Sequence, residues 1–353
     1  MIPMNQQPKK RLAIYVSQTD GKGTYPARRA ETIARTLPAD IEIIFIYEEG
    51  SMIAPEGFQT ATITNHSKLI QAVAEIKPDL LLRDSGSTSQ DELNKIKELV
   101  PAIIHFDDFG EGGKFADLVF QTLYAETNEK PPSHYVVGAT SFIADEQTAS
   151  FKNIGLKRRA TRPLPHLVIS FGDEDIGNLS YRALRHMMQL QIPLKVTVLI
   201  GKEYSHDVSE LRLMALTRRN TFIQEQPHNV TEVLSTADIV LCASGYLPYE
   251  IAVMGIPCVV LAQNEFELSL AFPKEQHGFI HLGSGRKVKQ SDLLNAIMEP
   301  LLHESRRKKA IARQIALNLG DGKDAVCEAI LYYLEYPKRK NHGETGKETI
   351  DLV

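Results

Sequence analysis

The segment SGYLPYEIAVMGIP, residues 244–257, determines the fold predicted for the second half of the chain. It follows the apolar run DIVLCA (238–243) and leads into PCVVLA (257–262), and both runs have the length and composition of buried strands. A strand, a tight turn and a short helix over 247–254 make up one βα unit of a parallel sheet. Such a turn directs the free backbone amides of a helix N-terminus outward, where they favour a phosphate.

The same alternation of apolar runs and helical-period segments extends over most of the chain, and it predicts an α/β fold with parallel sheets. From residue 291 onward the pattern is mostly helical. The expected strands are 11–16, 41–47, 79–83, 102–106, 117–121, 166–171, 194–200, 221–224, 238–243 and 257–262. The expected helices before residue 291 are 26–37, 67–76, 90–99, 178–191, 207–216, 230–236 and 247–254.

A chain of 353 residues exceeds what one hydrophobic core usually serves, so two domains are expected. Residues 153–165 fall in a basic stretch with two prolines, and its apolar residues follow neither the strand period nor the helix period. Such a stretch is typical of a linker. We therefore predict an N-terminal Rossmann-like domain over 1–152 and a second one over 166–336. Residues 337–353 are predicted to form a disordered tail.

The composition is that of a globular protein, with 43% apolar residues, 24% charged residues and a net charge of −4. Nothing in it indicates a nucleic-acid partner, and the basic runs 157–159 and 306–309 are expected to be solvated. No apolar stretch reaches the roughly 20 residues of a membrane span or resembles a signal peptide, which predicts a cytoplasmic protein. The three cysteines lie in apolar stretches and are expected to be buried thiols.

Polar residues near the predicted turns are the candidates for ligand binding. Glu250 falls in the first helical turn after 244–246, where its carboxylate could accept both ribose hydroxyls or simply favour the helix dipole. Asn264 follows a buried strand on the side of a parallel sheet where ligands collect. Gly172 has the same placement, but it also fits an ordinary strand-to-loop glycine.

At these residues the chain resembles the GT-B superfamily. It is most similar to the nucleotide-sugar hydrolases and spore-coat polysaccharide biosynthesis proteins of the PseG and SpsG type, which are related to MurG-like glycosyltransferases. The segment 244–257 resembles the donor-binding turn of that family, and further segments follow in the family's order. These are 21–37, 105–121, 166–184, 259–271 and 318–330.

The resemblance implies a GT-B fold, with two Rossmann-like domains facing a cleft, and a UDP-linked amino sugar as ligand. Glu250 would bind the ribose, Gly245 and Tyr246 would lie by the pyrophosphate, and Asn264 would reach the phosphate or sugar. Ser170, Phe171 and Gly172 would form the floor of the site. Gly23, in the glycine-rich loop of the first domain, and Arg29 after it would face the diphosphate. Neither a cofactor nor a metal is implied.

The departures from the family concern catalysis. Pro26 stands where the hydrolases have a histidine, and proline has no side chain that can accept a proton. Tyr246 and Leu247 replace the small hydroxyl residues of the donor turn. The substitute bases Asp20, Asp84, Asp107 and Asp108 lie at predicted strand ends, although each also fits a loop or cap. His105, Asp107 and Asp108 do not converge on a metal unless the chain bends.

Three functional hypotheses remain open from the sequence. The first is a nucleotide-sugar hydrolase or glycosyltransferase of surface or spore-coat polysaccharide biosynthesis. The second is a non-catalytic binding or scaffolding protein that kept the fold and lost the base. The third is a sugar-phosphate epimerase, although the carboxylate and histidine set it requires cannot be assembled from the sequence. The sequence does not decide whether the protein is an enzyme.

Overall fold

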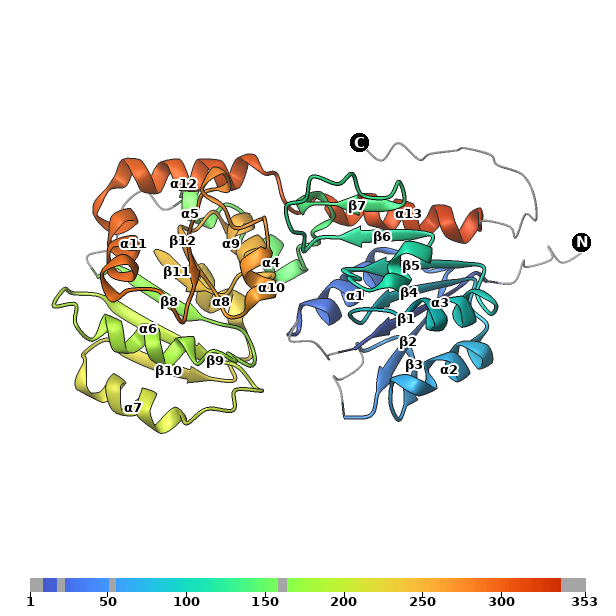
Figure 1. Ribbon diagram of the computed structural model, residues 1–353, viewed down its shortest axis with the longest axis horizontal. Coiled ribbons are helices and arrows are strands. Elements are labelled where there is room, and N and C mark those ends of the chain that lie inside the picture. The colour runs from blue at the N-terminus through green and yellow to red at the C-terminus, as the bar shows by residue number, and fades with distance from the viewer. Residues whose placement is uncertain (1–8, 18–22, 51–54, 158–163, 338–353) are drawn as a thin grey trace, which may run out of the picture. The chain divides into compact units, whose positions relative to one another are not determined.

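The structure is a computed structural model that describes residues 9–17, 23–50, 55–157 and 164–337. The chain forms two compact units (Figure 1). The first contains the described residues of Met1–Thr122, Glu129–Ile143 and Gly322–Val353, and the second contains those of Leu123–Asn128 and Ala144–Asp321.

In the described part of the first unit, seven parallel strands pair in the order β3-β2-β1-β4-β5-β6-β7. The central strands are apolar runs buried on both faces, as expected for a parallel sheet that helices cover on both sides. The strands are β1 (Arg11–Val16), β2 (Glu42–Glu48), β3 (Gln59–Ile63), β4 (Leu80–Asp84), β5 (Ala102–Phe106), β6 (Leu118–Gln121) and β7 (Tyr135–Val137).

Alternate residues of these strands feed two cores. Ile14 and Leu82 pack on the face covered by two helices, α1 (Tyr25–Thr36) and α13 (Gly322–Glu335). On the opposite face, Ala13 and Leu81 pack against two other helices. These are α2 (Leu69–Ile76) and α3 (Gln90–Lys97).

The C-terminal helix α13 belongs to the first unit, whereas the predicted second domain ran to residue 336. Its apolar residues Val326, Ile330 and Leu334 are at most 3% exposed and lie in the same core as β1 and β4. The hydroxyl of Tyr333 donates to the carbonyl of Asp117 at 3.0 Å. Burial of this apolar stripe holds α13 to the first sheet, which sequence order alone could not indicate.

The second unit repeats the architecture with six described strands in the order β10-β9-β8-β11-β12-β13, all parallel. The strands are β8 (His166–Ser170), β9 (Lys195–Ile200), β10 (Thr221–Glu225), β11 (Ile239–Cys242), β12 (Cys258–Ala262) and β13 (Phe279–Ser284). The helices are α4 (Glu146–Ser150), α5 (Ile154–Lys157), α6 (Leu179–Met187), α7 (Val208–Thr217), α8 (Val230–Ser235), α9 (Leu247–Met254), α10 (Glu265–Ser269), α11 (Gln290–Leu302) and α12 (Glu304–Ala316).

The strand order of the second unit reverses between β8 and β11. The chain runs outward from β8 through β9 to β10, then returns to pair β11 on the other side of β8. Loops that follow the two strands at such a switch point diverge to opposite faces of the sheet, and ligands of open α/β sheets bind there. The loops after β8 and β11 contain Gly172 and Gly245.

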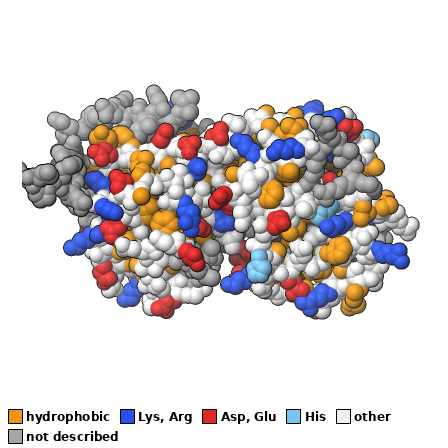
Figure 2. All heavy atoms as spheres, turned by 180° about the vertical axis from the view of Figure 1, so that it is seen from behind, with side chains coloured by type: hydrophobic (Ala, Val, Ile, Leu, Met, Phe, Trp, Pro, Cys, Tyr) orange, Lys and Arg blue, Asp and Glu red, His pale blue; other side chains and the backbone are white. Residues whose placement is uncertain are grey.

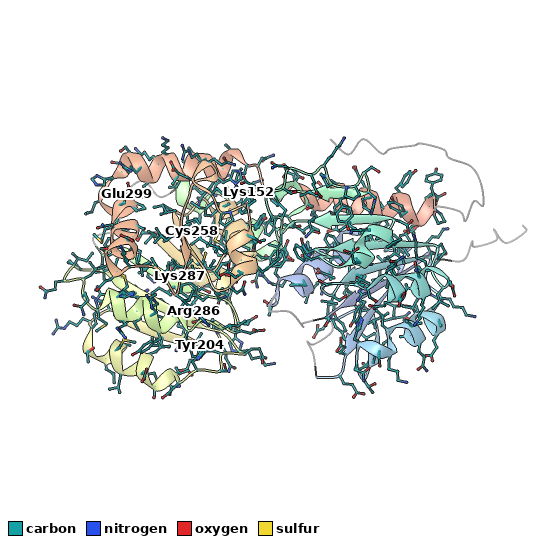
Figure 3. All side chains as sticks on the ribbon, viewed as in Figure 1. Lys152, Tyr204, Cys258, Arg286, Lys287 and Glu299 are labelled. Atoms are coloured by element: carbon teal, nitrogen blue, oxygen red, sulfur yellow. The ribbon has the colours of Figure 1, made fainter. Side chains whose placement is uncertain are left out.

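The two Rossmann-like parallel sheets confirm the predicted fold class. All three cysteines are free and buried, and Figure 3 places Cys258 in the interior of the second unit. None of the described helices is long and apolar enough to cross a membrane. On the face shown in Figure 2, basic and acidic side chains are interspersed without a continuous basic surface. The predicted linker lies partly, and the predicted tail almost wholly, outside the described residues.

Candidate functional site

The candidate site lies at the carboxyl edge of the second sheet, where β8, β11 and β12 run side by side. Ser170 pairs in register with Cys242, and Cys242 with Val260, so these strands end at the same level. The loops that follow bring the predicted residues 170–172, 244–246 and 264 to one edge. Ser170 and Phe171 are 5% and 1% exposed, which places them beneath this edge.

Side chains cap four of the five helices that follow strands β8 to β12. The Asp175 carboxylate accepts the amides of Leu179 and Ser180 in α6 at 2.7 and 2.8 Å. Side-chain oxygens cap α7, α8 and α10 in the same way. The residues that supply them are Asp207, Asn229 and Asn264.

Helix α9 begins in a different way. Its N-cap residue is Tyr246, and the Tyr246 side chain makes no capping hydrogen bond. Pro248 stands within that turn and has no amide to be satisfied. The partial positive charge of this helix N-terminus favours an anion nearby.

Ser244 and Gly245 flank this helix end. Ser244 is fully buried, and its hydroxyl has no hydrogen-bond partner among the described residues. A Cβ placed on Gly245 would meet no atom within 4 Å, so open space borders its backbone. Gly172 also borders open space, and its φ of +83° requires glycine's conformational freedom. A ligand oxygen at this edge would find a hydroxyl and a helix N-terminus together.

Glu267 is a site residue that the sequence interpretation missed. Its carboxylate accepts the amide of Gln263 at 2.9 Å and that of Ser244 at 3.3 Å, so it ties the end of β12 to the end of β11. Burial raises the pKa of Glu267, and the hydrogen bonds from the two amides oppose the shift. The Gln263 side chain donates in turn to the carbonyl of Phe171 at 3.0 Å. Glu267 and Gln263 therefore hold the three loops in position.

Glu250 is more enclosed than the sequence suggested, because it is only 3% exposed. Burial raises the pKa of Cys242 far above its usual value, and the charges of Glu267 and Glu250 add to the shift. Glu250 lies in the first turn of α9, which follows β11 through the turn 244–246. Tyr246 is buried as well, at 6%, whereas Asn264 is exposed.

Asn264 is the N-cap residue of α10. Its side-chain oxygen accepts the amide of Glu267 at 2.9 Å and so begins α10. This cap also holds the Glu267 carboxylate near β11. The sequence placed Asn264 at the sheet edge but did not identify it as an N-cap.

In the first unit, Arg29 lies in a buried ion cluster. It is 1% exposed and pairs with Asp84 at 2.7 Å and with Asp107 at 3.0 Å. Its guanidinium also stacks 4.2 Å from the ring centre of Phe106. These contacts hold Arg29 between two strand ends, so its placement does not support the predicted contact with a diphosphate.

A second buried pair joins His105 to Asp108. Asp107 has a φ of +48°, and this bend brings the two side chains together, with Nδ1 of His105 donating to Oδ2 of Asp108 at 2.6 Å. The amide of Thr88 also donates to Asp108, at 3.0 Å. Burial alone would raise the pKa of Asp108, but the hydrogen bonds from His105, Thr88 and Gly110 outweigh it and lower the pKa. A low pKa makes Asp108 a weak base at neutral pH.

His66 is the more accessible histidine at the carboxyl edge of the first sheet. Its Nδ1 lies 2.9 Å from the hydroxyl of Tyr15, and its Nε2 lies 2.8 Å from the Glu92 carboxylate. Arg83 also pairs with Glu92, at 2.9 Å. Burial would raise the pKa of Glu92, but His66 and Arg83 outweigh it and lower the pKa. The His66 side chain is 44% exposed, so this network connects buried groups of the first unit to solvent.

Three other predicted features are placed as follows. Pro26 is buried in the first turn of α1, and Gly23 precedes that helix with a φ of +62°. Asp20 lies outside the described residues. Within the described ranges, no group of three or more His, Cys, Asp or Glu side chains is arranged to hold a metal ion.

The burial of His105 predicts how the free energy of unfolding changes with pH. Burial lowers the pKa of His105 below its unfolded value of about 6.5, so below that pH the unfolded chain binds more protons than the folded one. The free energy of unfolding should therefore fall with decreasing pH, and His105 should contribute up to about 1.4 kcal/mol per pH unit. Urea unfolding of wild type and His105→Asn between pH 7 and pH 5 measures this, since the variant should show the shallower slope. Equal slopes of unfolding free energy against pH in wild type and His105→Asn would contradict this prediction.

No protein-family model matches the chain. Among curated proteins it is similar to an uncharacterized protein of Methanocaldococcus jannaschii, with 23% identity over 240 residues, and to spore coat polysaccharide biosynthesis protein SpsG of Bacillus subtilis, with 24% over 265. The first match covers 64% of this chain and 50% of the Methanocaldococcus protein. The second covers 71% of this chain and 74% of SpsG. The chain thus spans half the length of the Methanocaldococcus protein.

Solved structures share the fold at low identity. MurG of Acinetobacter baumannii superposes with a TM-score of 0.66 at 14% identity, covering 91% of this chain and 99% of MurG. UDP-GlcNAc 2-epimerase of Neisseria meningitidis, bound to UDP-GlcNAc, superposes with a TM-score of 0.59 at 10% identity, covering 91% and 99%. Together with the two parallel sheets, these matches show that the chain has a GT-B, glycosyltransferase-like fold.

Proposed function

We propose that the second unit binds a UDP-linked amino sugar at the carboxyl edge of its sheet. The observation that carries the proposal is the buried Ser244 hydroxyl, which has no hydrogen-bond partner among the described residues and lies between the end of β11 and the open space at Gly245, just before α9. A pyrophosphate there would accept a hydrogen bond from Ser244 and would be favoured by the helix N-terminus. The structural neighbours support this ligand, because the Neisseria meningitidis epimerase binds UDP-GlcNAc.

The other predicted residues have roles in the same proposal. Gly172 and Gly245 leave room for the ligand, the amide near Tyr246 faces the pyrophosphate, and Glu250 binds the ribose. Asn264 is exposed and accepts the amide of the Glu267 anchor, and it would meet the sugar or phosphate.

The reaction we propose is hydrolysis or transfer at the anomeric carbon, with the nucleotide diphosphate as leaving group. The α9 amides would stabilise the negative charge that develops on that group. The SpsG relative supports a role in polysaccharide biosynthesis. The alternative is a binding protein without turnover, and the observation that favours it is the buried Pro26 at the position of the hydrolase histidine.

Substitution of Gly245 tests ligand binding. The residue does not have a positive φ and its Cβ meets open space, so Gly245→Leu should fold normally while filling the space before α9. We expect its Kd for UDP to rise at least tenfold, whereas Gly245→Ala should stay within about threefold. Calorimetric titration of UDP measures both. Equal affinity of Gly245→Leu and wild type would contradict this location.

Turnover separates the enzyme from the binding protein. Wild type would be incubated with a panel of UDP-linked amino sugars, with and without sugar acceptors, and release of UDP would be followed. Release that Gly245→Leu abolishes supports catalysis at this edge. Binding of UDP without release from any donor would establish the non-catalytic alternative.

A further inference from the structure

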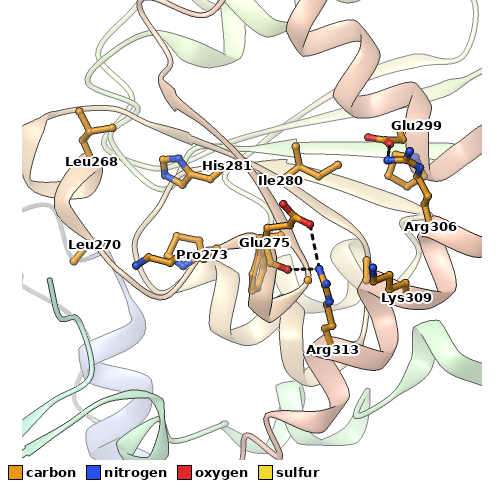
Figure 4. A pocket seen from close by; sticks show the side chains of 15 residues that line it. Leu268, Leu270, Pro273, Glu275, Ile280, His281, Glu299, Arg306, Lys309 and Arg313 are labelled. Carbon is orange, nitrogen blue, oxygen red and sulfur yellow. Dashed lines mark hydrogen bonds and ion pairs between the residues drawn. The ribbon is translucent and has the colours of Figure 1, made fainter. Parts of the chain in front are cut away.

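The sheet of the second unit has two edge strands, β13 and β10, and the chain itself closes the edge at β13. The amide of Phe279 in β13 donates to the carbonyl of Lys274 at 3.1 Å. Gly278 packs so closely on α12 that a Cβ there would collide with the carbonyl oxygen of Ala310. Figure 4 shows α12 beside this strand. A partner that adds a strand to this sheet therefore has only the edge at β10 open to it.

The outer side of β10 carries unpaired main-chain groups. The carbonyl of Asn220 accepts the amide of Val196 in β9, so residue 220 faces β9. In a parallel strand, alternate residues direct their main-chain groups to alternate sides, and Thr221, Ile223 and Glu225 therefore face outward. Within the described ranges, no group outside the sheet hydrogen-bonds the main chain of these three residues. Such an edge is a template for a further strand.

Large apolar side chains are exposed beside this edge. In α7, Leu213 and Leu216 are 62% and 84% exposed and lie one turn apart on the same side of the helix. Arg212 also lies one turn from Leu216, and its guanidinium reaches Glu225 of β10 at 2.6 Å, which places this side of α7 along the β10 edge (Figure 1). On the opposite face of the strand, Phe222 is 48% exposed. Apolar side chains gathered at one free edge are typical of a protein interface.

The two ends of α7 carry opposite charges. Asp207 and Glu210 lie at its N-terminal end, whereas Arg218 and Arg219 directly follow its last residue, Thr217. Glu210 and Arg219 are exposed, and neither forms an ion pair with a residue that the structure describes. A two-fold axis through the middle of β10 exchanges these ends, so that Glu210 of each copy meets Arg219 of the other. The surface is thus self-complementary, as an interface between two identical copies requires.

We propose that a second copy of the chain binds this edge, with the two β10 strands paired antiparallel about a two-fold axis at Ile223. Because the main chain of Ile223 faces outward, the two copies of this residue exchange both hydrogen bonds, and Thr221 pairs with Glu225 of the second copy in the same way. The exposed leucines of the two α7 helices pack together over the paired strands. The two Phe222 rings lie diagonally across the other face, within reach of each other.

This interface is independent of the proposed nucleotide-sugar site. It is formed by α7 and β10, whereas the candidate site lies where β8, β11 and β12 end. Dimerisation can therefore fail while UDP binding holds, and the reverse.

Sedimentation velocity of the full chain measures the association. One short strand and one helix face from each copy make a small interface, so we expect a dimer with a micromolar Kd. Leu216→Glu should raise this Kd at least tenfold, because a carboxylate replaces an apolar contact near the axis. Leu302→Glu is the matched control, since Leu302 is 69% exposed at the end of α11, outside this surface. It should stay within about threefold of wild type.

Exchange of the charged ends tests the two-fold arrangement. Glu210→Lys alone and Arg219→Glu alone each bring like charges together twice in a dimer, and each should raise the Kd at least tenfold. The double variant restores opposite charges across the interface and should return to within about threefold of wild type. Such recovery requires that each end of α7 meets the other end in the second copy.

Hydrogen exchange tests the main-chain pairing. In the dimer, the amides of Thr221, Ile223 and Glu225 should exchange at least tenfold more slowly than in monomeric Leu216→Glu. The intervening amides bond β9 in both species and should not change. This alternation separates strand pairing from a contact made by side chains alone.

Four results would each overturn the proposal. The first is a wild type that stays monomeric at about 100 µM, which would leave the edge to another occupant. The second is equal weakening of the dimer by the two leucine variants. The third is a double charge variant that associates no better than the single ones. The fourth is unchanged exchange of the three outward amides in the dimer.

Discussion

Replacing Glu250 with alanine is expected to weaken UDP binding about 100-fold. In the proposed complex the carboxylate accepts both ribose hydroxyls, and hydrogen bonds to a charged group contribute roughly 1.5–3 kcal/mol each. The 3% exposure of Glu250 places it where water does not compete strongly for these bonds. Calorimetric titration of UDP into wild type and Glu250→Ala gives the ratio of the two Kd values.

Glu232→Ala provides the matched control for this change. Glu232 also lies in the first turn of a helix of the second unit, α8, but it is exposed. If Glu250 only favours its helix dipole, both variants should bind UDP like wild type. Glu250→Gln keeps the volume and removes the charge, so it separates loss of contacts from loss of folding. If folded Glu250→Ala binds UDP with a Kd within threefold of wild type, Glu250 does not bind the ribose.

Replacing Arg29 with methionine is expected to destabilise the first unit by about 3–5 kcal/mol. The change leaves the carboxylates of Asp84 and Asp107 buried without their cation, and breaking a buried ion pair in this way costs far more than removing both partners. The melting temperature should fall by roughly 6–20 °C, since about 2–4 °C corresponds to 1 kcal/mol in a domain of this size. Thermal unfolding followed by circular dichroism measures the shift.

Arg35→Met is the control on the same helix. Arg35 is 52% exposed and pairs with Glu31 at 2.7 Å, and exposed pairs contribute at most about 1 kcal/mol. Combining Arg29→Met with Asp84→Asn and Asp107→Asn should recover part of the lost stability, because no buried charge is then left unpaired. Equal melting temperatures for Arg29→Met and Arg35→Met would show that the cluster does not stabilise the unit.

The fold could be predicted from the sequence where burial leaves a clear pattern. Strands such as 11–16 and 102–106 are apolar runs because helices cover both faces, and their predicted bounds agree with the structure. The helix over 247–254 was predicted with its observed bounds, since Pro248 marks its start and Gly255 ends it with a φ of +65°. The parallel alternation then fixed the fold class.

Edge elements and long-range packing could not be predicted in the same way. The strand β3 is QTATI and mostly exposed, and β13 contains His281 and Gly283, so neither shows a buried apolar run. Helix α13 follows the second unit in sequence but packs in the first. Its amphipathic pattern predicts a helix and cannot identify the sheet that the helix covers.

The positions of the candidate residues in the fold could be predicted from the sequence, but many of their contacts could not. Residues 172, 245 and 264 follow buried strands, and the rule for parallel sheets places them at one edge. Glu267 was missed because an acid in a short helix resembles an ordinary first-turn residue. The His105–Asp108 pair was missed because it depends on the bend at Asp107, which alternation along a strand does not include.

The most direct test of a nucleotide site at α9 is a titration of the isotope-labelled protein with UDP, followed by backbone amide chemical shifts. We expect saturable shifts that are largest at Gly245, Tyr246 and the first turn of α9, with smaller ones at Gly172 and Asn264. The capped N-termini of α6 and α8 should not respond. Shifts confined to other regions, or none at millimolar UDP, would contradict the account.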